Sequence, residues 1–91
     1  MANELILETR LDSAAAEGLR ARLVAHQGDD LALDASNVEV IGGLCLEVIL
    51  SAQHHWKTAG HSFSFSAHSA NFHENLARFG LDMAFFKEAA E

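Results

Sequence analysis

The chain has 91 residues, of which 49 % are apolar, and its formal charge is −7. This length allows one domain with a modest core, and the apolar share is typical of a globular protein and not of a disordered one. The cations are scattered, so the basic stripe of a nucleic-acid-binding protein is not expected. They are Arg10, Arg20, Arg22, Lys57, Arg78 and Lys87.

The expected cellular environment follows from the apolar runs and the cysteine content. The longest apolar runs are a few residues, whereas a membrane span needs about 20, so membrane insertion is not expected. The first residues carry acids and no basic segment, so no signal peptide is expected. Cys45 is the only cysteine and cannot form an internal disulfide. Together these features predict a cytoplasmic protein.

The first third of the chain predicts a strand, a helix and a second strand. Glu4–Thr9 holds apolar residues between acids, which is typical of a strand. Asp12 or Ser13 is expected to cap a helix that closes at Gln27-Gly28. Leu31–Ala35 then predicts the second strand. The expected apolar face of the helix comprises Ala15, Ala16, Leu19, Leu23 and Val24.

The middle of the chain predicts the longest helix. Val38–Ile41 is a short extended piece that leads to Gly42-Gly43, and the helix is expected from about Gly43 to Ala59, with Gly60 ending it. Apolar residues at i, i+3, i+4, i+7 and i+11 form one continuous stripe. These residues are Cys45, Val48, Ile49, Ala52 and Trp56.

The last third predicts one strand and one helix. His61–Ser66 alternates phenylalanine with serine, which is typical of a strand with one face in the core. Ser69 is expected to cap a helix that Gly80 ends, and Leu81–Phe86 is expected to dock as a final turn or short helix. The residues expected to share the apolar face of this helix are Phe72, Leu76 and Phe79. The resulting order, β-α-β-α-β-α, predicts an α/β fold with helices on a largely parallel sheet.

Residues 33–50 resemble the signature region of STAS domains, which occur in anti-sigma-factor antagonists and in the cytoplasmic tails of sulphate transporters. In that family a strand ends in a pattern like Leu-Asp-x-Ser-x-Val-x-x-Ile, and a loop of Asp-Ser-Ser-Gly type then leads to a helix. The matching residues are Asp34, Ser36, Val38 and Ile41, with Leu46, Val48 and Leu50 on the helix. The residues that resemble the family's last helix are Ser69, Phe72, Leu76, Gly80 and Leu81.

The resemblance covers the chain from about Glu4 to Leu81. It implies a single STAS-like domain over residues 1–91, with its core at about 4–86. It also implies a mixed, mostly parallel four-stranded sheet with packed helices. The implied function is a non-catalytic protein-interaction module of bacterial regulation.

One departure from the family pattern concerns the loop before the long helix. In antagonists that phosphorylation switches, this loop carries an acid followed by serines, and the corresponding segment here is Gly42-Gly43-Leu44-Cys45. The position of the phosphorylated serine is Leu44, which has no hydroxyl group. The resemblance therefore implies a degenerate member that binds a partner without phosphoserine control. Members of this kind are linked to chemotaxis operons and to lipid-transport ATPases.

The candidate partner-binding surface is the start and the polar face of the long helix. It comprises Gly42, Gly43, Leu44, Glu47, Ser51 and His54. Leu44 is expected to be partly exposed and to serve as an apolar contact, although it can equally fill space beneath the loop. The expected partner is a regulatory protein: an anti-sigma-type kinase, a chemotaxis component or a transporter ATPase.

Several other residues have a structural as well as a functional interpretation. Asp34 and Ser36 are a candidate ligand pocket at a strand end, or they satisfy turn amides. Gly42-Gly43 is a candidate anion nest, but such a turn is more often a tight connection. Trp56 and Phe85-Phe86 are a candidate interaction patch, or core.

The sequence offers little for catalysis or metal binding. Cys45 lies on the apolar stripe, where a thiol is normally buried and inert. The histidines form no zinc-binding pattern, so they are expected at the surface, and no metal or other cofactor is expected. They are His26, His54, His55, His61, His68 and His73. We therefore expect no enzyme. Three alternatives to the interaction module stay open: a module that binds a nucleotide or lipid between the loop and the sheet, a subunit of a lipid-transport ATPase complex, and a homodimer.

Overall fold

A parallel three-stranded sheet forms the centre of the computed structural model, which describes residues 3–81. Its strands are β1 (Asn3–Ile6), β3 (Leu31–Ala35) and β5 (Phe63–His68), in the order β1-β3-β5. β3 pairs in parallel with both neighbours. Parallel neighbours need crossover connections, and two helices supply them.

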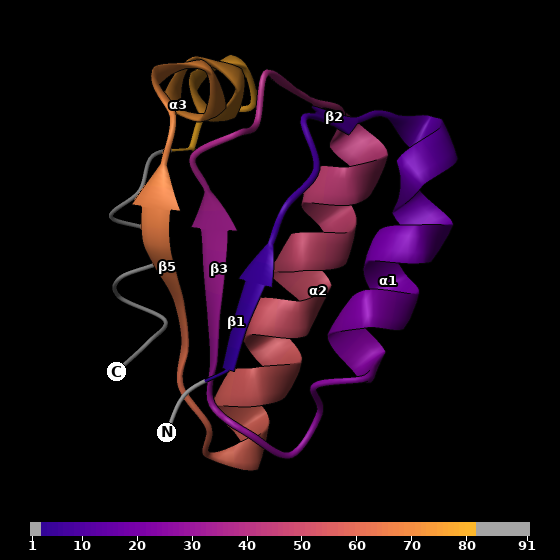
Figure 1. Cartoon of the computed structure of the whole chain (residues 1–91), viewed down its shortest axis with the longest axis vertical. Coiled ribbons are helices and arrows are strands. Elements are labelled where there is room, and N and C mark those ends of the chain that lie inside the picture. Colours follow the sequence, from indigo (N-terminus) through magenta and orange to yellow (C-terminus); the bar gives the residue numbers. More distant parts are fainter. Residues whose placement is uncertain (1–2, 82–91) are drawn as a thin grey trace.

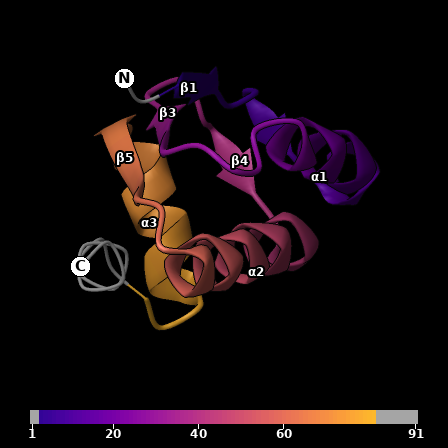
Figure 2. The same cartoon turned by 90° about the horizontal axis from the view of Figure 1, so that it is seen from below.

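The two crossover helices lie side by side on one face of the sheet (Figures 1 and 2). α1 (Ala16–Val24), which follows the 3₁₀ turn η1 (Ser13–Ala15), connects β1 to β3, and α2 (Gly43–Ala59) connects β3 to β5. α3 (Ala70–Arg78) crosses the carboxyl ends of the strands (Figure 1). The predicted bounds of α2 and β3 are confirmed.

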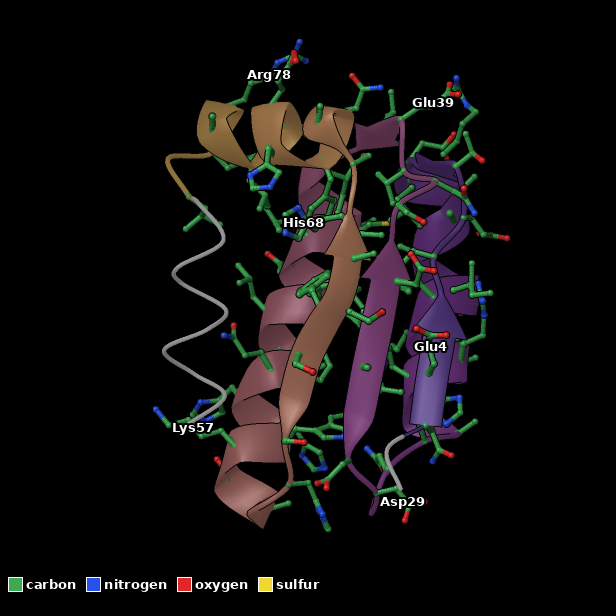
Figure 3. The ribbon with its side chains drawn as sticks, turned by 60° about the vertical axis from the view of Figure 1, so that its left-hand side comes forward. Glu4, Asp29, Glu39, Lys57, His68 and Arg78 are labelled. Atoms are coloured by element: carbon green, nitrogen blue, oxygen red, sulfur yellow. The ribbon has the colours of Figure 1, made fainter. Side chains whose placement is uncertain are left out.

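The core lies between the sheet and the helices because the strands alternate. Leu31, Leu33 and Phe63 point inward and are buried, whereas Glu4 and Ser64 are exposed on the opposite face (Figure 3 labels Glu4). The apolar stripe of α2 closes the core from the other side, with Cys45, Ile49 and Trp56 buried. The prediction that β5 has one core face and one polar face is confirmed.

The strand count differs from the predicted four-stranded mixed sheet. Among residues 3–81, β2 (Arg10–Leu11) and β4 (Val40–Ile41) form a separate, parallel two-stranded pair beside the main sheet. Both pairings of the main sheet are parallel, so no antiparallel strand is present in the described chain. The predicted α/β architecture is confirmed. The main sheet has three strands instead of the predicted four, and the short β2–β4 pair stands beside it.

The first helix departs from the prediction at both ends. Asp12 precedes η1 without a side-chain capping hydrogen bond, and α1 ends at Val24, before the expected Gln27-Gly28. Gly28 does adopt the left-handed conformation, with φ +94°, but it does so in the loop. Val24 was expected on the apolar face and is instead exposed.

The last helix begins as predicted. The Ser69 hydroxyl accepts a hydrogen bond from the backbone N–H of Phe72 at 3.0 Å, and it donates to the Val38 carbonyl at 2.6 Å. The first bond satisfies an otherwise free amide of the helix, and the second joins α3 to the segment before β4. The predicted final turn at Leu81–Phe86 lies, after Leu81, outside the described residues.

Candidate functional site

The start of α2 is held by the short β2–β4 pair. Gly42 has extended dihedral angles, and its N–H donates to the Leu11 carbonyl at 2.9 Å, while its own carbonyl accepts from the Leu46 N–H at 3.0 Å. No side chain caps the helix. Gly42-Gly43 is therefore a tight connection that presents the first turn of α2 at the surface.

Two large apolar side chains are half-exposed at this helix start. Leu44 is 49 % exposed and Phe79, at the end of α3, is 46 % exposed. A Cβ added at Gly43 would lie 3.5 Å from Cε1 of Phe79, so the ring rests against the Gly43 backbone. Phe79 was expected in the core with Phe72 and Leu76, and its exposure corrects that expectation.

Phe79 is a candidate binding residue that the helical spacing did not identify as exposed. The helical spacing places it on the face of Phe72, but the backbone at Phe79 leaves the helix, with φ −98° and ψ 9°. Gly80 follows with φ +75°. The one available signal was this glycine, because the residue next to a C-terminal glycine no longer follows the helical periodicity.

The predicted polar face of α2 is exposed but does not form one cluster. Glu47, Ser51 and His54 are all exposed. Glu47 and Ser51 line a groove between α1 and α2, and His54 is not part of its lining. The structure therefore brings Glu47 and Ser51 together with residues of α1.

The structure places Asp34 and Ser36 in a local turn at the end of β3. Oδ1 of Asp34 accepts hydrogen bonds from the Ser36 hydroxyl at 2.6 Å and from the Ser36 N–H at 2.9 Å. The hydroxyl bond, followed by the backbone bond, lowers the pKa of Asp34 below its usual value of 3.8. This pair satisfies turn amides, and neither residue lines the groove between α1 and α2. Their assignment to a ligand pocket stays a prediction.

Cys45 is enclosed on the core side of the helix. Its side chain is fully buried, and Sγ donates to the Asp12 carbonyl at 3.2 Å. Burial raises the pKa of the thiol, and the carboxylates of Asp12 and Glu8 raise it further. The thiolate, which is the nucleophilic form, is therefore disfavoured.

The histidines show one contact that their spacing did not predict. Nε2 of His73 lies 2.6 Å from Nδ1 of His68, which is labelled in Figure 3. One ring therefore donates a hydrogen bond to the other across the junction of β5 and α3. In residues 3–81, no three His, Cys, Asp or Glu side chains come together in a way that could hold a metal ion. Zinc sites need three or four protein ligands.

The predicted aromatic patch of Trp56 and Phe85-Phe86 lies partly in the core and partly outside the described residues. Trp56 is buried, its ring packs against Phe63, and its Nε1–H donates to the Asp29 carbonyl at 2.8 Å. Trp56 thus follows the structural interpretation, although one side of it also borders the groove between α1 and α2. Phe85-Phe86 lies outside the described residues.

Comparison with known proteins agrees with this architecture. The family model described as "Mlab, STAS domain" matches residues 2–86. No curated protein and no solved structure matches the chain significantly. Within residues 3–81, no helix has both the length and the apolar character needed to cross a membrane. Because the match covers nearly the whole sequence and the α/β fold agrees with it, this chain belongs to the STAS domain family.

Proposed function

We propose that this STAS domain is a non-catalytic protein-interaction module of bacterial regulation that docks a partner at the start of α2 without phosphoserine switching. The observation that carries the proposal is the pair of half-exposed apolar side chains next to Gly43: Leu44, which follows it in the chain, and Phe79, whose ring lies against it. Apolar and aromatic residues at the centre of a patch contribute most of the binding energy in protein interfaces. A leucine at this position offers a contact surface and no hydroxyl to phosphorylate.

The polar surroundings of this patch fit a docking surface. Glu47 lies one turn after Leu44 on α2, and Arg78 precedes Phe79 on α3; both are exposed. A polar rim around an apolar centre is the usual composition of such interfaces. The negative charge of the whole chain favours a basic partner surface. The partner classes that we propose are an anti-sigma-type kinase, a chemotaxis component or a transporter ATPase.

A non-catalytic role is part of the proposal. It is supported by the state of the single cysteine, whose thiol is buried with a raised pKa. It is also supported by the Asp34 carboxylate, which is engaged with Ser36 in its own turn. A cytoplasmic location belongs to the same proposal.

The test is affinity capture from the source cells, read by mass spectrometry, with wild type and Leu44→Glu in parallel. We expect a regulatory protein that wild type retains and Leu44→Glu loses by at least about tenfold, since a buried charge at an interface centre costs well over 1.4 kcal/mol. The matched control is Ile6→Glu, because Ile6 is 54 % exposed but lies on the open face of the sheet. Identical capture profiles for all three proteins, with folding verified by circular dichroism, would refute the proposal.

A further inference from the structure

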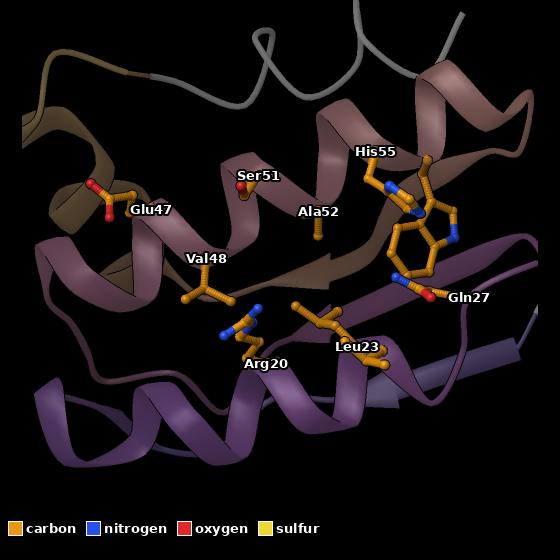
Figure 4. Close-up of a pocket in the computed structure, with 10 residues that line it drawn as sticks. Arg20, Leu23, Gln27, Glu47, Val48, Ser51, Ala52 and His55 are labelled. Atoms are coloured by element: carbon orange, nitrogen blue, oxygen red, sulfur yellow. The ribbon is translucent and has the colours of Figure 1, made fainter.

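A groove runs between α1 and α2 on the side of these helices that faces away from the sheet (Figure 4). Its volume is about 450 Å³. Four residues of α1 and the loop after it form one wall, and six residues of α2 form the other. The lining comprises Arg20, Leu23, Val24, Gln27, Glu47, Val48, Ser51, Ala52, His55 and Trp56.

The bottom of the groove is apolar. Leu23, Ala52 and Trp56 are buried core residues whose outer sides border the groove, and Val48 is half-buried between the helices. Val24 stands on the α1 rim with 51 % of its surface exposed. This valine is a large apolar residue of α1 that the core does not use, although its helical spacing matches the core positions.

Four polar side chains that line the groove form no ion pair or side-chain hydrogen bond with another described residue, whereas the ring of His55 contacts that of Trp56. Within the described part of the chain, Arg20 and Glu47 have no ion-pair partner, and Gln27 and Ser51 make no side-chain hydrogen bond. Arg20 reaches toward Val48 in the middle of the groove, and Glu47 lies toward one end of it (Figure 4). The groove therefore has two unpaired charges of opposite sign on facing walls.

We propose that this groove receives an amphipathic helix of the partner protein, with a carboxylate placed at Arg20 and a basic side chain placed at Glu47. The inference rests on the proposed function, because it names the segment by which the docked partner is held. The mixed charges favour a polypeptide, which can supply both signs, over a compact anion, which Glu47 would repel. Laying an apolar helix face into such a groove is a common mode of protein recognition.

The dimensions of the groove agree with this occupant. Its α2 wall extends from Glu47 to Trp56, a rise of about 13.5 Å at 1.5 Å per residue, or two and a half turns. A partner helix of that length presents apolar residues at i, i+4 and i+7 to the groove. Leu44 is four residues before Val48 and so lies on the same side of α2, which joins the groove to the surface at the helix start.

The experiment is photo-crosslinking in the source cells, with benzoylphenylalanine incorporated at Val24 of the full chain and, as the matched control, at Ile6. Both side chains are about half exposed, but Ile6 lies on the open sheet face. Mass spectrometry of the adduct identifies the segment that is attached. We expect Val24 alone to label a segment with apolar residues at i, i+4 and i+7 and with both acidic and basic flanking residues.

Two variants test whether the groove itself holds that segment. Ser51→Lys, at an exposed position, and Arg20→Glu should each reduce the Val24 adduct at least tenfold, and reversing the partner's acidic residue should restore labelling of Arg20→Glu. A lipid adduct, an adduct to a segment without the helical apolar pattern, or an adduct that both variants leave unchanged would overturn the inference. Neither variant alters a buried side chain, and folding is verified by circular dichroism.

The same data separate the two proposals. If wild type captures a partner that Leu44→Glu loses, while Val24 gives no adduct with it, the groove inference fails and the docking function stands. If no protein is captured and no adduct forms, both fail together.

Discussion

Asp34 and Ser36 illustrate at the scale of single residues how one motif can serve the fold. Asp34 lies near the end of β3 and Ser36 just beyond it, and the two form a closed hydrogen-bonded turn. The carboxylate accepts both the hydroxyl and the amide of Ser36, so its charged form is stabilised. The turn directs the chain from β3 toward β4 and thereby toward the start of α2.

This turn predicts a pH dependence of stability. The folded pKa of Asp34 lies below the usual 3.8, so its contribution is fully present above about 3.8 and is lost as the pH falls through the folded value. We expect Ser36→Ala to raise the pKa of Asp34 toward 3.8, because the hydroxyl bond is the largest cause of the shift. Carboxyl carbon NMR titration measures this directly. An unchanged titration midpoint in Ser36→Ala would show that the bond does not stabilise the carboxylate.

At the scale of elements, α1 contrasts with α2. α2 has one continuous apolar stripe and a C-terminal glycine, Gly60, with φ +82°, so its bounds follow from local signals. α1 is shorter and holds Gly18 in its interior, with Val24 exposed at its end. Because glycine disfavours a helix and the apolar face is narrow, α1 depends more on packing against α2 for its stability.

The same substitution at two glycines should have opposite effects. Gly18 is exposed inside α1, and a Cβ there would meet no atom within 4 Å, so Gly18→Ala should raise the free energy of unfolding by about 0.5–1 kcal/mol. Gly28 has φ +94°, where a side chain is strained, so Gly28→Ala should lower it by about 1–2 kcal/mol. Urea denaturation measures both. Stabilisation by both variants, or by neither, would contradict this assignment of the two backbone conformations.

At the scale of the whole molecule, the two crossover helices cover one face of the sheet and enclose the core. The two crossover helices bury the apolar side of β1, β3 and β5 in one core, which also includes Leu11 and Ile41 from the short pair. α3 closes the carboxyl end of the sheet through Phe72 and Leu76. This packing positions the end of α3 beside the start of α2, so the candidate docking surface exists only in the assembled fold.

Cys45 provides a measure of the opening of this core. It is fully buried, so a thiol reagent should reach it only when the domain opens. With an opening free energy of about 5 kcal/mol, labelling of the native protein should be slower than that of the urea-unfolded chain by more than about 1,000-fold. The control is the exposed thiol of Ser51→Cys in a Cys45→Ala background, which should react at once. Equally fast labelling of native Cys45 would mean that the core around it is open.

The sequence by itself determined the elements whose signals are local. The bounds of α2 and β3, the cap at Ser69 and the glycine at the end of α2 and of α3 depend on periodicity and on backbone preferences within a few residues. The family motif is also visible in the sequence alone, whereas the assignment of Leu44 to the position of the family's phosphorylated serine stays a prediction. The exposure of Leu44 confirms one expectation about the candidate site, although its role in binding stays a prediction.

The tertiary structure decided which surfaces these elements share. The β2–β4 pair joins residues far apart in the chain, and no local pattern of two residues predicts such a pairing. Val24 and Phe79 have core-like spacing but lie at helix ends, where exposure depends on the neighbouring element. The groove between α1 and α2 and the contact of Phe79 with Gly43 arise likewise from packing between helices. Periodicity states which side of a helix is apolar, whereas the neighbouring elements decide how much of that side is covered.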